Sequence, residues 1–383
     1  MTSTPQTAQN LTLKLYHARE QKQRKKNDLP YTFPGVFSII EARKKSHPLT
    51  EREEYPMDEL LRQGYLGNPA QLVTLRRVTV NEGTAKGTEL IQVHTAGGLA
   101  LDLLPDAGLD IGQCRYRGVN MSWMSKNGYD SPAAISSHED EFVHTFPGGL
   151  LYTCGLRSAG PANRDGGEWH PLHGRYHSLA ADHISARVEG EEVVVRGTVR
   201  ETALFGPVLE VERTIRIPVF GASVTVEDTV TNRTPRDEAF MQIYHCNFGY
   251  PLLSEEARLI LPPERETIPR TEFAKTGLGR ECTFDRPIPG EEERVFFQKM
   301  KRDFRARLEN PALGVAMDLT WSGDTLPILS QWRSMASGDY VLGLEPTNCY
   351  IMGRHDEREN GTLPVLNAFE SVHHTVKITF AQL

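Results

Sequence analysis

The segment Leu209-Glu-Val-Glu-Arg-Thr-Ile-Arg-Ile217 alternates apolar and polar side chains, and it decides the fold class. Successive side chains of a strand point to opposite faces of a sheet. The apolar residues that share one face are Leu209, Val211, Ile215 and Ile217. The polar residues on the other face are Glu210, Glu212, Thr214 and Arg216. Residues 224–231 repeat the pattern, which is typical of an antiparallel sheet with one solvated face.

Many short segments around this pair have the same texture. The further segments that we predict to be strands are residues 73–80, 90–94, 99–104, 183–188, 193–199, 240–245, 258–261, 304–308, 315–321, 340–344 and 376–380. In all, about fifteen strands with no helices alternating between them argue against a parallel α/β sheet, and no fixed repeat favours a propeller. We therefore predict an all-β fold, a large antiparallel β-sandwich over residues 66–383, with an N-terminal extension of helices and loops over residues 1–65.

The composition is that of a globular chain. Of 383 residues, 39% are hydrophobic and 24% are charged, which excludes wholesale disorder and a coiled coil. The net charge of −7 argues against a general nucleic-acid binder, which needs a basic surface. The basic run at residues 18–26 is interpreted as a solvated tail or helix face.

The sequence also bears on the compartment. No apolar run approaches the ~20 residues of a membrane-spanning helix. Residues 1–12 contain no apolar segment of the kind found in secretory signals. The five cysteines stand far apart without a paired motif, which is typical of reduced thiols. We predict a cytoplasmic protein with no membrane or nucleic-acid partner.

Two segments interrupt the strand pattern with glycine, histidine and arginine. Residues 146–157 contain adjacent glycines, which let a backbone approach a ligand closely, and end at Arg157. The alternative is a turn with a surface arginine. Residues 169–177 contain three histidines, which exchange protons near neutral pH, and Arg175. Their spacing does not match a helical or paired-cysteine zinc motif.

Two strand ends carry further polar groups. Alternation places His245 and Asn247 on one face, and the alternative is a buried, hydrogen-bonded histidine. Glu345 ends an apolar strand, where desolvation would raise its pKa and suit it to proton transfer. Histidines, a glutamate and an arginine suffice for acid–base chemistry on a hydroxylated molecule. No nucleophile elbow, phosphate loop or dinucleotide motif is present, and no motif requires a cofactor.

Three motifs, in order, carry a family resemblance: Pro171-Leu-His-Gly-Arg175, His245-Cys-Asn-Phe-Gly249 and Leu344-Glu-Pro-Thr-Asn348. They resemble motifs of the aldose 1-epimerase (galactose mutarotase) superfamily. More closely, the chain from about Gly67 onward resembles a bacterial branch of mutarotase-like proteins labelled as a domain of unknown function. The segments that resemble this branch are residues 67–71, 104–111, 146–155 and 172–175.

The resemblance implies a β-supersandwich with a shallow sugar cleft and cofactor-free catalysis. It implies that His245 is the general acid, that Glu345 is the general base, and that His173 orients or polarises the sugar. No counterpart of the family's substrate-binding aspartate is found between residues 262 and 300.

Four further residues are predicted to contact the substrate. Arg157 lies near the position of a substrate-binding arginine of the family, and Arg175 replaces a glycine of its motif. Asn247 and Asn348 complete the set. The extra arginine favours a carboxylated, sulfonated or phosphorylated sugar.

We predict a carbohydrate epimerase of the aldose 1-epimerase (mutarotase) type, an isomerase of carbohydrate metabolism that binds a small sugar. One alternative is another sugar reaction on the same scaffold, such as isomerisation, elimination or hydrolysis. This includes a metal-dependent isomerase with His173, His245 and Glu345 as ligands. The other alternative is a non-catalytic sugar-binding protein.

Overall fold

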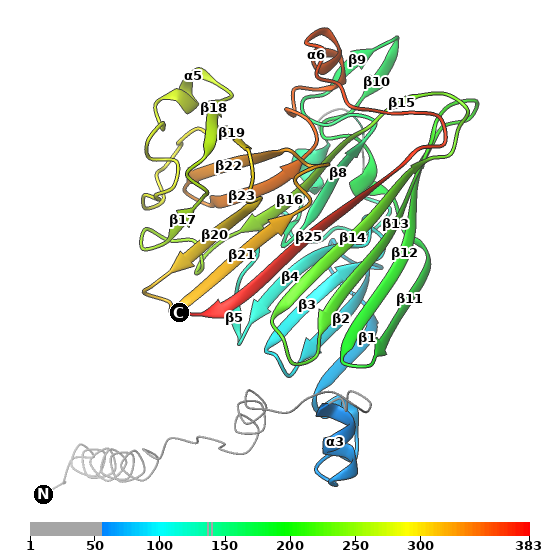
Figure 1. Ribbon diagram of the computed structural model, residues 1–383, viewed down its shortest axis with the longest axis vertical. Helices are drawn as coiled ribbons and strands as arrows, with labels where there is room; N and C mark the ends of the chain where they lie inside the picture. The colour runs from blue at the N-terminus through cyan, green and yellow to red at the C-terminus, as the bar shows by residue number, and fades with distance from the viewer. Residues whose placement is uncertain (1–55, 136–137, 139–140) are drawn as a thin grey trace, which may run out of the picture. The chain divides into compact units, whose positions relative to one another are not determined.

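The computed structural model describes residues 56–135, 138 and 141–383 (Figure 1). They belong to one compact unit, Tyr55–Leu383. Its first helix, α3 (Pro56–Arg62), carries acidic residues in its first turn and Arg62 in its last, as the helix dipole favours. The rest of the predicted N-terminal extension, residues 1–55, lies outside the described residues, and its boundary stays a prediction.

The first sheet is an antiparallel meander of five strands. Its strands are β1 (Val73–Thr79), β2 (Glu89–Thr95), β3 (Leu99–Leu104), β4 (Asp110–Tyr116) and β5 (Val119–Asn120). A 3-10 turn, η1 (Pro69–Gln71), precedes β1 and is capped by Asn68. The first three strands coincide with segments predicted from alternation.

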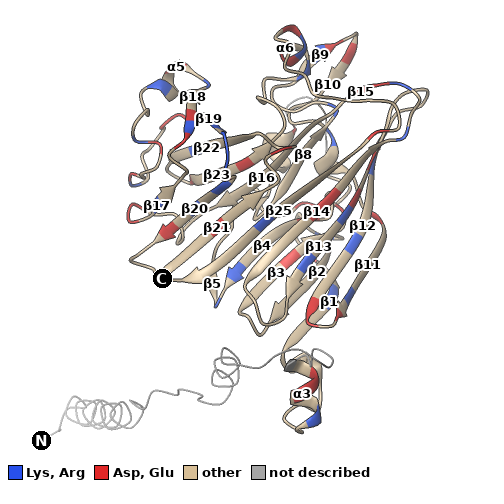
Figure 2. Ribbon diagram, viewed as in Figure 1, with Lys and Arg blue, Asp and Glu red and all other residues tan. Residues whose placement is uncertain are grey.

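The second sheet has eight strands in the order β11-β12-β13-β14-β25-β21-β20-β17. Their bounds are β11 (Asp182–Glu189), β12 (Glu192–Thr202), β13 (Val208–Pro218), β14 (Ser223–Asn232), β17 (Arg258–Ile260), β20 (Arg305–Asn310), β21 (Val315–Trp321) and β25 (Ser371–Gln382). The C-terminal strand β25 lies in the middle, between β14 and β21 (Figure 1). The predicted apolar face of β13 is buried, which confirms the alternation. Charged residues of both signs lie along β12–β14 and form cross-strand pairs such as Arg216–Glu227 at 3.0 Å (Figure 2).

The third sheet has six strands in the order β18-β19-β22-β23-β16-β8. Their bounds are β8 (Tyr152–Leu156), β16 (Met241–Phe248), β18 (Arg265–Pro269), β19 (Arg294–Met300), β22 (Ile328–Ala336) and β23 (Asp339–Thr347). The two-stranded pairs are β6 (Trp123–Met124) with β7 (Gly148–Gly149), β9 (Asn163–Asp165) with β10 (Glu168–His170), and β15 (Glu238–Ala239) with β24 (Val365–Leu366). The remaining helical turns are α4 (Phe142–Thr145), η2 (Tyr176–Ser178), α5 (Glu272–Lys275) and α6 (Arg354–Glu359).

The main core lies between these sheets. It joins Ile91 of the five-stranded sheet, Ile215 of the eight-stranded sheet and Leu344 of the six-stranded sheet in one buried cluster. All pairings between the named strands are antiparallel, so the predicted all-β sandwich is confirmed. Within the described part of the chain, no helix has both the length and the apolar character to cross a membrane.

Arg213 is a fully buried cation where the three sheets meet. On its own sheet it donates from Nη2 to Asp228 Oδ2 of β14 at 2.7 Å. It also pairs with Asp110 of β4 at 2.5 Å and donates to Thr153 Oγ1 of β8 at 2.9 Å. Tyr244 of β16 donates to the same Asp228 carboxylate at 2.7 Å. One guanidinium thus connects all three sheets.

We predict that Arg213→Met destabilises the protein far more than Arg216→Met, a change on the same strand. The first variant leaves two buried carboxylates without a cation and should lower the free energy of unfolding by about 3–5 kcal/mol. Arg216 is about one-third exposed, and Arg216→Met should lower the free energy of unfolding by about 1 kcal/mol or less. Urea unfolding followed by circular dichroism measures both, and equal losses would contradict the assigned role of Arg213.

Candidate active site

A cavity of about 480 Å³ opens on the outer face of the six-stranded sheet. Strands β16, β22, β23 and β19 supply its floor through His245, Ser330, Glu345 and Val295. Loops, short turns and residues of β6, β22 and β23 supply its walls. The wall residues used below are Trp123, Lys126, Phe142, Phe146, His173, Arg270, Glu293, Trp332 and Asp339.

Strand register brings His245 and Glu345 together. Ile243 pairs with Thr347 and Cys246 with Leu344, so His245 lies opposite Glu345 between them. Opposed residues on an antiparallel pair project from the same face of the sheet, with their Cβ atoms about 5 Å apart. Two residues a hundred positions apart in the sequence therefore become immediate neighbours in the cavity.

The Glu345 carboxylate is buried beside the imidazole. Its Oε1 lies 3.3 Å from His245 Nε2, and the side chain is only 3% exposed. At Gly343, two residues earlier on the same face, a Cβ would lie 2.5 Å from this oxygen, so glycine leaves the carboxylate its place. Burial raises the pKa of Glu345 above its ordinary value, while the neighbouring His245 opposes that shift. A carboxylate with a raised pKa is suited to accepting a proton.

His173 enters the cavity from the loop after β10. Its backbone is left-handed, with φ of 58°, and its N–H donates to the Gly160 carbonyl at 2.8 Å. Non-glycine residues adopt this conformation rarely, and such strain gathers at functional sites. Desolvation lowers the pKa of His173 well below its ordinary value, and the charge of His245 lowers it further. The two imidazole rings are 6.1 Å apart.

Aromatic rings enclose the polar groups. Phe146 and Trp332 lie against the His245 ring with centroids 5.4 Å and 5.3 Å away. Trp123 contacts Trp332 edge-on at 5.8 Å, and Phe142 packs on His173 at 4.9 Å. These rings restrict water around His245 and Glu345 and give the cavity apolar surface beside its polar groups.

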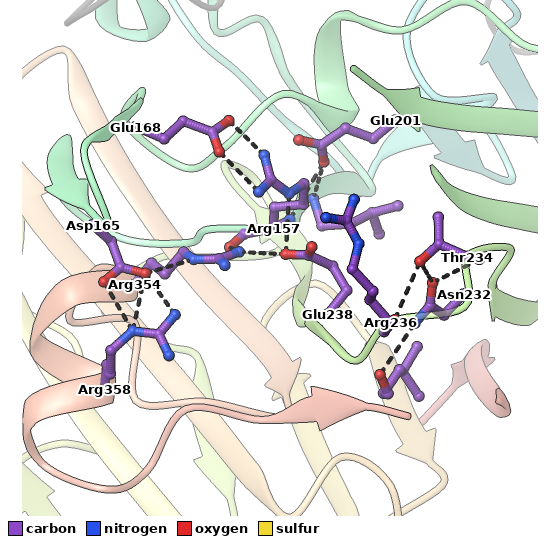
Figure 3. A network of polar contacts seen from close by, with 12 residues as sticks. Arg157, Asp165, Glu168, Glu201, Asn232, Thr234, Arg236, Glu238, Arg354 and Arg358 are labelled. Atoms are coloured by element: carbon purple, nitrogen blue, oxygen red, sulfur yellow. Dashed lines mark hydrogen bonds and ion pairs between the residues drawn. The ribbon is translucent and has the colours of Figure 1, made fainter. Parts of the chain in front are cut away.

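The structure places Arg157 outside the cavity lining. Its Nη2 donates to Glu168 Oε2 at 2.9 Å and its Nε to Glu238 Oε1 at 3.2 Å (Figure 3). Arg354 binds the same Glu238 at 2.9 Å. The Arg157 guanidinium is therefore engaged by carboxylates of its own chain, and the substrate contact predicted for it has no support from this geometry.

The other three predicted substrate contacts also lie outside the lining. Arg175 donates to the Trp169 carbonyl at 3.3 Å. Asn247 does share the face of His245, but its amide donates to the Gly149 carbonyl at 3.2 Å. Asn348 connects two strands of the sheet, because its Oδ1 accepts from Gln242 N at 2.8 Å. The cavity thus gathers His173, His245 and Glu345 but none of the four residues predicted to bind the substrate.

Arg270 and Glu293 are among the lining residues that the sequence analysis did not single out. Arg270 directly follows β18 and lies 3.6 Å from Glu293 Oε1. Glu293 directly precedes β19 and accepts from Trp332 Nε1 at 2.7 Å. Both stand next to strands that the sequence did not reveal. Their only signal was a charged residue beside a short apolar run.

Among the residues that the structure describes, no three His, Cys, Asp or Glu side chains are arranged to hold a metal ion. The metal-dependent alternative would use His173, His245 and Glu345, which the cavity brings near one another without that arrangement.

A family model described as "Domain of unknown function (DUF4432)" matches residues 85–380, most of the chain and every strand that builds the cavity floor. The chain belongs to the DUF4432 family. A search of the curated proteins finds no match.

Solved structures that are similar to this chain include proteins named as epimerases or as mutarotase-like. A Klebsiella pneumoniae protein called a "putative aldose 1-epimerase" is 24% identical, with a TM-score of 0.75 over 81% of this chain and 84% of that chain. Galactose 1-epimerase from Lactobacillus acidophilus is 16% identical, with a TM-score of 0.57 over 81% of this chain and 99% of that chain. A galactose mutarotase-like protein from Clostridium acetobutylicum is 13% identical, with a TM-score of 0.57 over 82% of this chain and all of that chain. These likenesses establish the predicted galactose mutarotase-like fold.

His177 packs edge-on against the cavity-lining residue Phe142, with ring centroids 5.2 Å apart, and it gives a pH prediction. His177 stacks on Tyr152 at 5.4 Å, and neither ring nitrogen has a partner. Burial lowers the pKa of His177 from 6.5 to about 3. As the pH falls below about 6.5, the unfolded chain binds this proton first, so stability present above that pH is progressively lost.

We therefore expect the free energy of unfolding to fall less steeply with decreasing pH in His177→Phe than in the wild type. The slope should differ by about 1.4 kcal/mol per pH unit below pH 6. The same substitution at the exposed His94 is the control. Urea unfolding at several values between pH 6.5 and 4.5 measures the slopes. An unchanged slope in His177→Phe would show that this histidine is not buried in its neutral form.

Proposed function

We propose that this protein is a sugar epimerase of the aldose 1-epimerase type. The observation that carries the proposal is the 3.3 Å approach of His245 Nε2 and Glu345 Oε1 at the floor of a cavity lined also by Phe and Trp rings. In mutarotation a base takes the proton of the anomeric hydroxyl while an acid protonates the ring oxygen. Both oxygens are bonded to the same carbon, so the two catalytic groups must lie side by side.

In the proposed reaction Glu345 accepts the hydroxyl proton and His245 donates a proton to the ring oxygen. The C1–O5 bond breaks and the open-chain aldehyde forms. After rotation about the C1–C2 bond, the C5 hydroxyl attacks the other face of the carbonyl carbon. His245 then regains its proton from that hydroxyl, and Glu345 returns its own to the new anomeric oxygen.

The supporting residues have separate roles in this proposal. His173, held neutral by its surroundings, donates or accepts a hydrogen bond to a ring substituent. Arg270 lies at the rim, where its charge acts on both His173 and Glu345. Trp332 and Trp123 form the surface on which the sugar's carbon face rests.

The cavity's charges favour a neutral sugar over an acidic one. Lys126 pairs with Asp339 at 2.7 Å and Arg270 lies 3.6 Å from Glu293, so both cations at the rim face carboxylates. Glu345 adds a further buried carboxyl group to the floor. The acidic sugar predicted from Arg157 and Arg175 therefore has no matching cation in the lining that is free of an acidic partner.

We expect Glu345→Gln to slow anomer exchange by about 100-fold or more, because glutamine keeps the shape but cannot accept the proton. His245→Asn should slow it similarly, and the double variant should lose little more, since both groups act in one exchange. The measurement is exchange NMR on a panel of neutral and acidic sugars, with sugar affinity measured separately.

Glu201→Gln is the matched control. Glu201 is also a buried glutamate with a raised pKa caused by burial, but it accepts the Leu156 N–H at 2.9 Å away from the cavity. Exchange should stay near the wild-type rate in this variant. Near-normal exchange in Glu345→Gln would remove Glu345 as the base. If the wild-type protein leaves the exchange of every sugar at its uncatalysed rate, the result would point to another sugar reaction or to a binding protein.

A further inference from the structure

A second cavity, of about 250 Å³, lies on the other side of β19 and β22. Side chains alternate along these strands, so Glu293, Val295 and Trp332 line the candidate active site. Their neighbours Arg294 and Arg333 point the opposite way and line the second cavity. Charged residues of both signs lie in and around α5, β18 and β19 (Figure 2).

Arg294 and Arg333 face each other directly. They are cross-strand partners on β19 and β22, and their side chains are 14% and 4% exposed. Like charges in directly opposed positions destabilise a sheet, and burying them adds a desolvation cost. Burial, followed by the charge of Arg294, lowers the pKa of Arg333. Such an arrangement is stable when an anion lies between the two groups.

Carboxylates of the chain itself balance only part of this positive charge. Arg294 Nη1 contacts Glu291 Oε1 at 2.7 Å, and Arg333 Nη2 lies 3.5 Å from Asp285 Oδ2. Three buried polar atoms at this cavity remain without a hydrogen-bond partner: Nε of Arg294, Nε of Arg333 and Oε2 of Glu291. Two donors and one acceptor are therefore unsatisfied within one small cavity.

Arg280 adds a third guanidinium at the mouth. It pairs with Asp285 at 2.8 Å, and its side chain is 66% exposed, so the cavity is accessible from solvent. The lining then holds three arginines against two carboxylates, Asp285 and Glu291, which leaves an excess of positive charge.

We propose that this cavity binds a small anion that also carries hydroxyl groups, a sugar acid or a sugar phosphate. Its anionic oxygens accept from the guanidinium groups of Arg280, Arg294 and Arg333, and a hydroxyl donates to the Glu291 carboxylate. A simple anion fills the donors but leaves the acceptor unpaired, and a neutral polyol leaves the excess positive charge unbalanced. The proposal does not rest on the function proposed for the first cavity, because the two lie on opposite faces of the sheet.

The test is isothermal titration calorimetry of the full chain with three probes. D-gluconate and glycerol 3-phosphate carry an anion and hydroxyls, and D-glucitol carries hydroxyls alone. We expect at least one of the two anions to bind and the polyol not to bind. The anion that binds shows whether the cavity takes a carboxylate or a phosphate. Absence of binding by both anions at millimolar concentration, or equal binding of D-glucitol, would overturn the proposal.

Two exposed arginines provide the matched pair of variants. Arg280→Ala removes a cation from the lining and should weaken anion binding about fivefold. Arg286→Ala removes a more exposed cation of the same segment, one that pairs with Glu255 at 2.8 Å outside the lining, and should leave binding unchanged. Equal affinity in wild type and Arg280→Ala would place the anion elsewhere, the first cavity included, and overturn the proposal.

Glu291→Gln tests the hydroxyl contact. It replaces the acceptor Oε2 by an NH2 group that cannot accept from the ligand's hydroxyl, while the amide oxygen keeps the contact to Arg294. The variant should therefore lose the preference for D-gluconate over acetate, or for glycerol 3-phosphate over inorganic phosphate, because the lost charge affects both anions of a pair alike. Urea unfolding of each variant checks that the fold is retained. An unchanged preference in a folded Glu291→Gln protein would contradict the proposed hydroxyl contact.

Discussion

The buried guanidinium of Arg213 is the constraint on which the rest of the structure depends. It is 0% exposed and is held by Asp110 and Asp228, which are equally buried. A cation removed from water in this way is tolerated only when its charge and its donors are fully matched. The matching groups come from all three large sheets, so the sheets can pack in only one relative position. Arg213 also lies 5.2 Å from the Tyr176 ring, next to the loop that presents His173.

That packing leaves the two faces of the six-stranded sheet with different environments. The inner face carries Leu342 and Leu344 into the main core, and the outer face carries His245 and Glu345 into the cavity. The core fixes the strands on one side, so strand register and the 3.3 Å contact between His245 and Glu345 hold the polar groups on the other. Desolvation by this scaffold is also what raises the pKa of Glu345. The same alternation places the opposed arginines Arg294 and Arg333 behind the active-site floor.

Prediction from sequence succeeded where one face of a strand meets water. The eight-stranded sheet was read almost completely, because β13 and β14 show polar and apolar faces in turn. It failed for β8, β18, β19 and β22, four of the six strands of the sheet that bears the site. β8 is buried at every position and β22 at most, so no period of two is visible there. Glu293 was missed for the same reason, because it precedes β19, which is buried at most positions. Arg270 follows β18, a strand with no buried position and therefore no apolar face to reveal it.

By itself the sequence determined the fold class, the family and the chemically capable residues, because periodicity and residue type are local properties. It could not determine which residues meet. His245 and Glu345 are neighbours because β16 and β23 pair in one register, and Arg157 is engaged by Glu168 and Glu238 because other strands bring those carboxylates to it. An alternating pattern reports the face on which a side chain lies but not the strand that will lie beside it. Only the tertiary structure, through strand order and register, decided that His245 and Glu345 share a cavity with Arg270 rather than with Arg157.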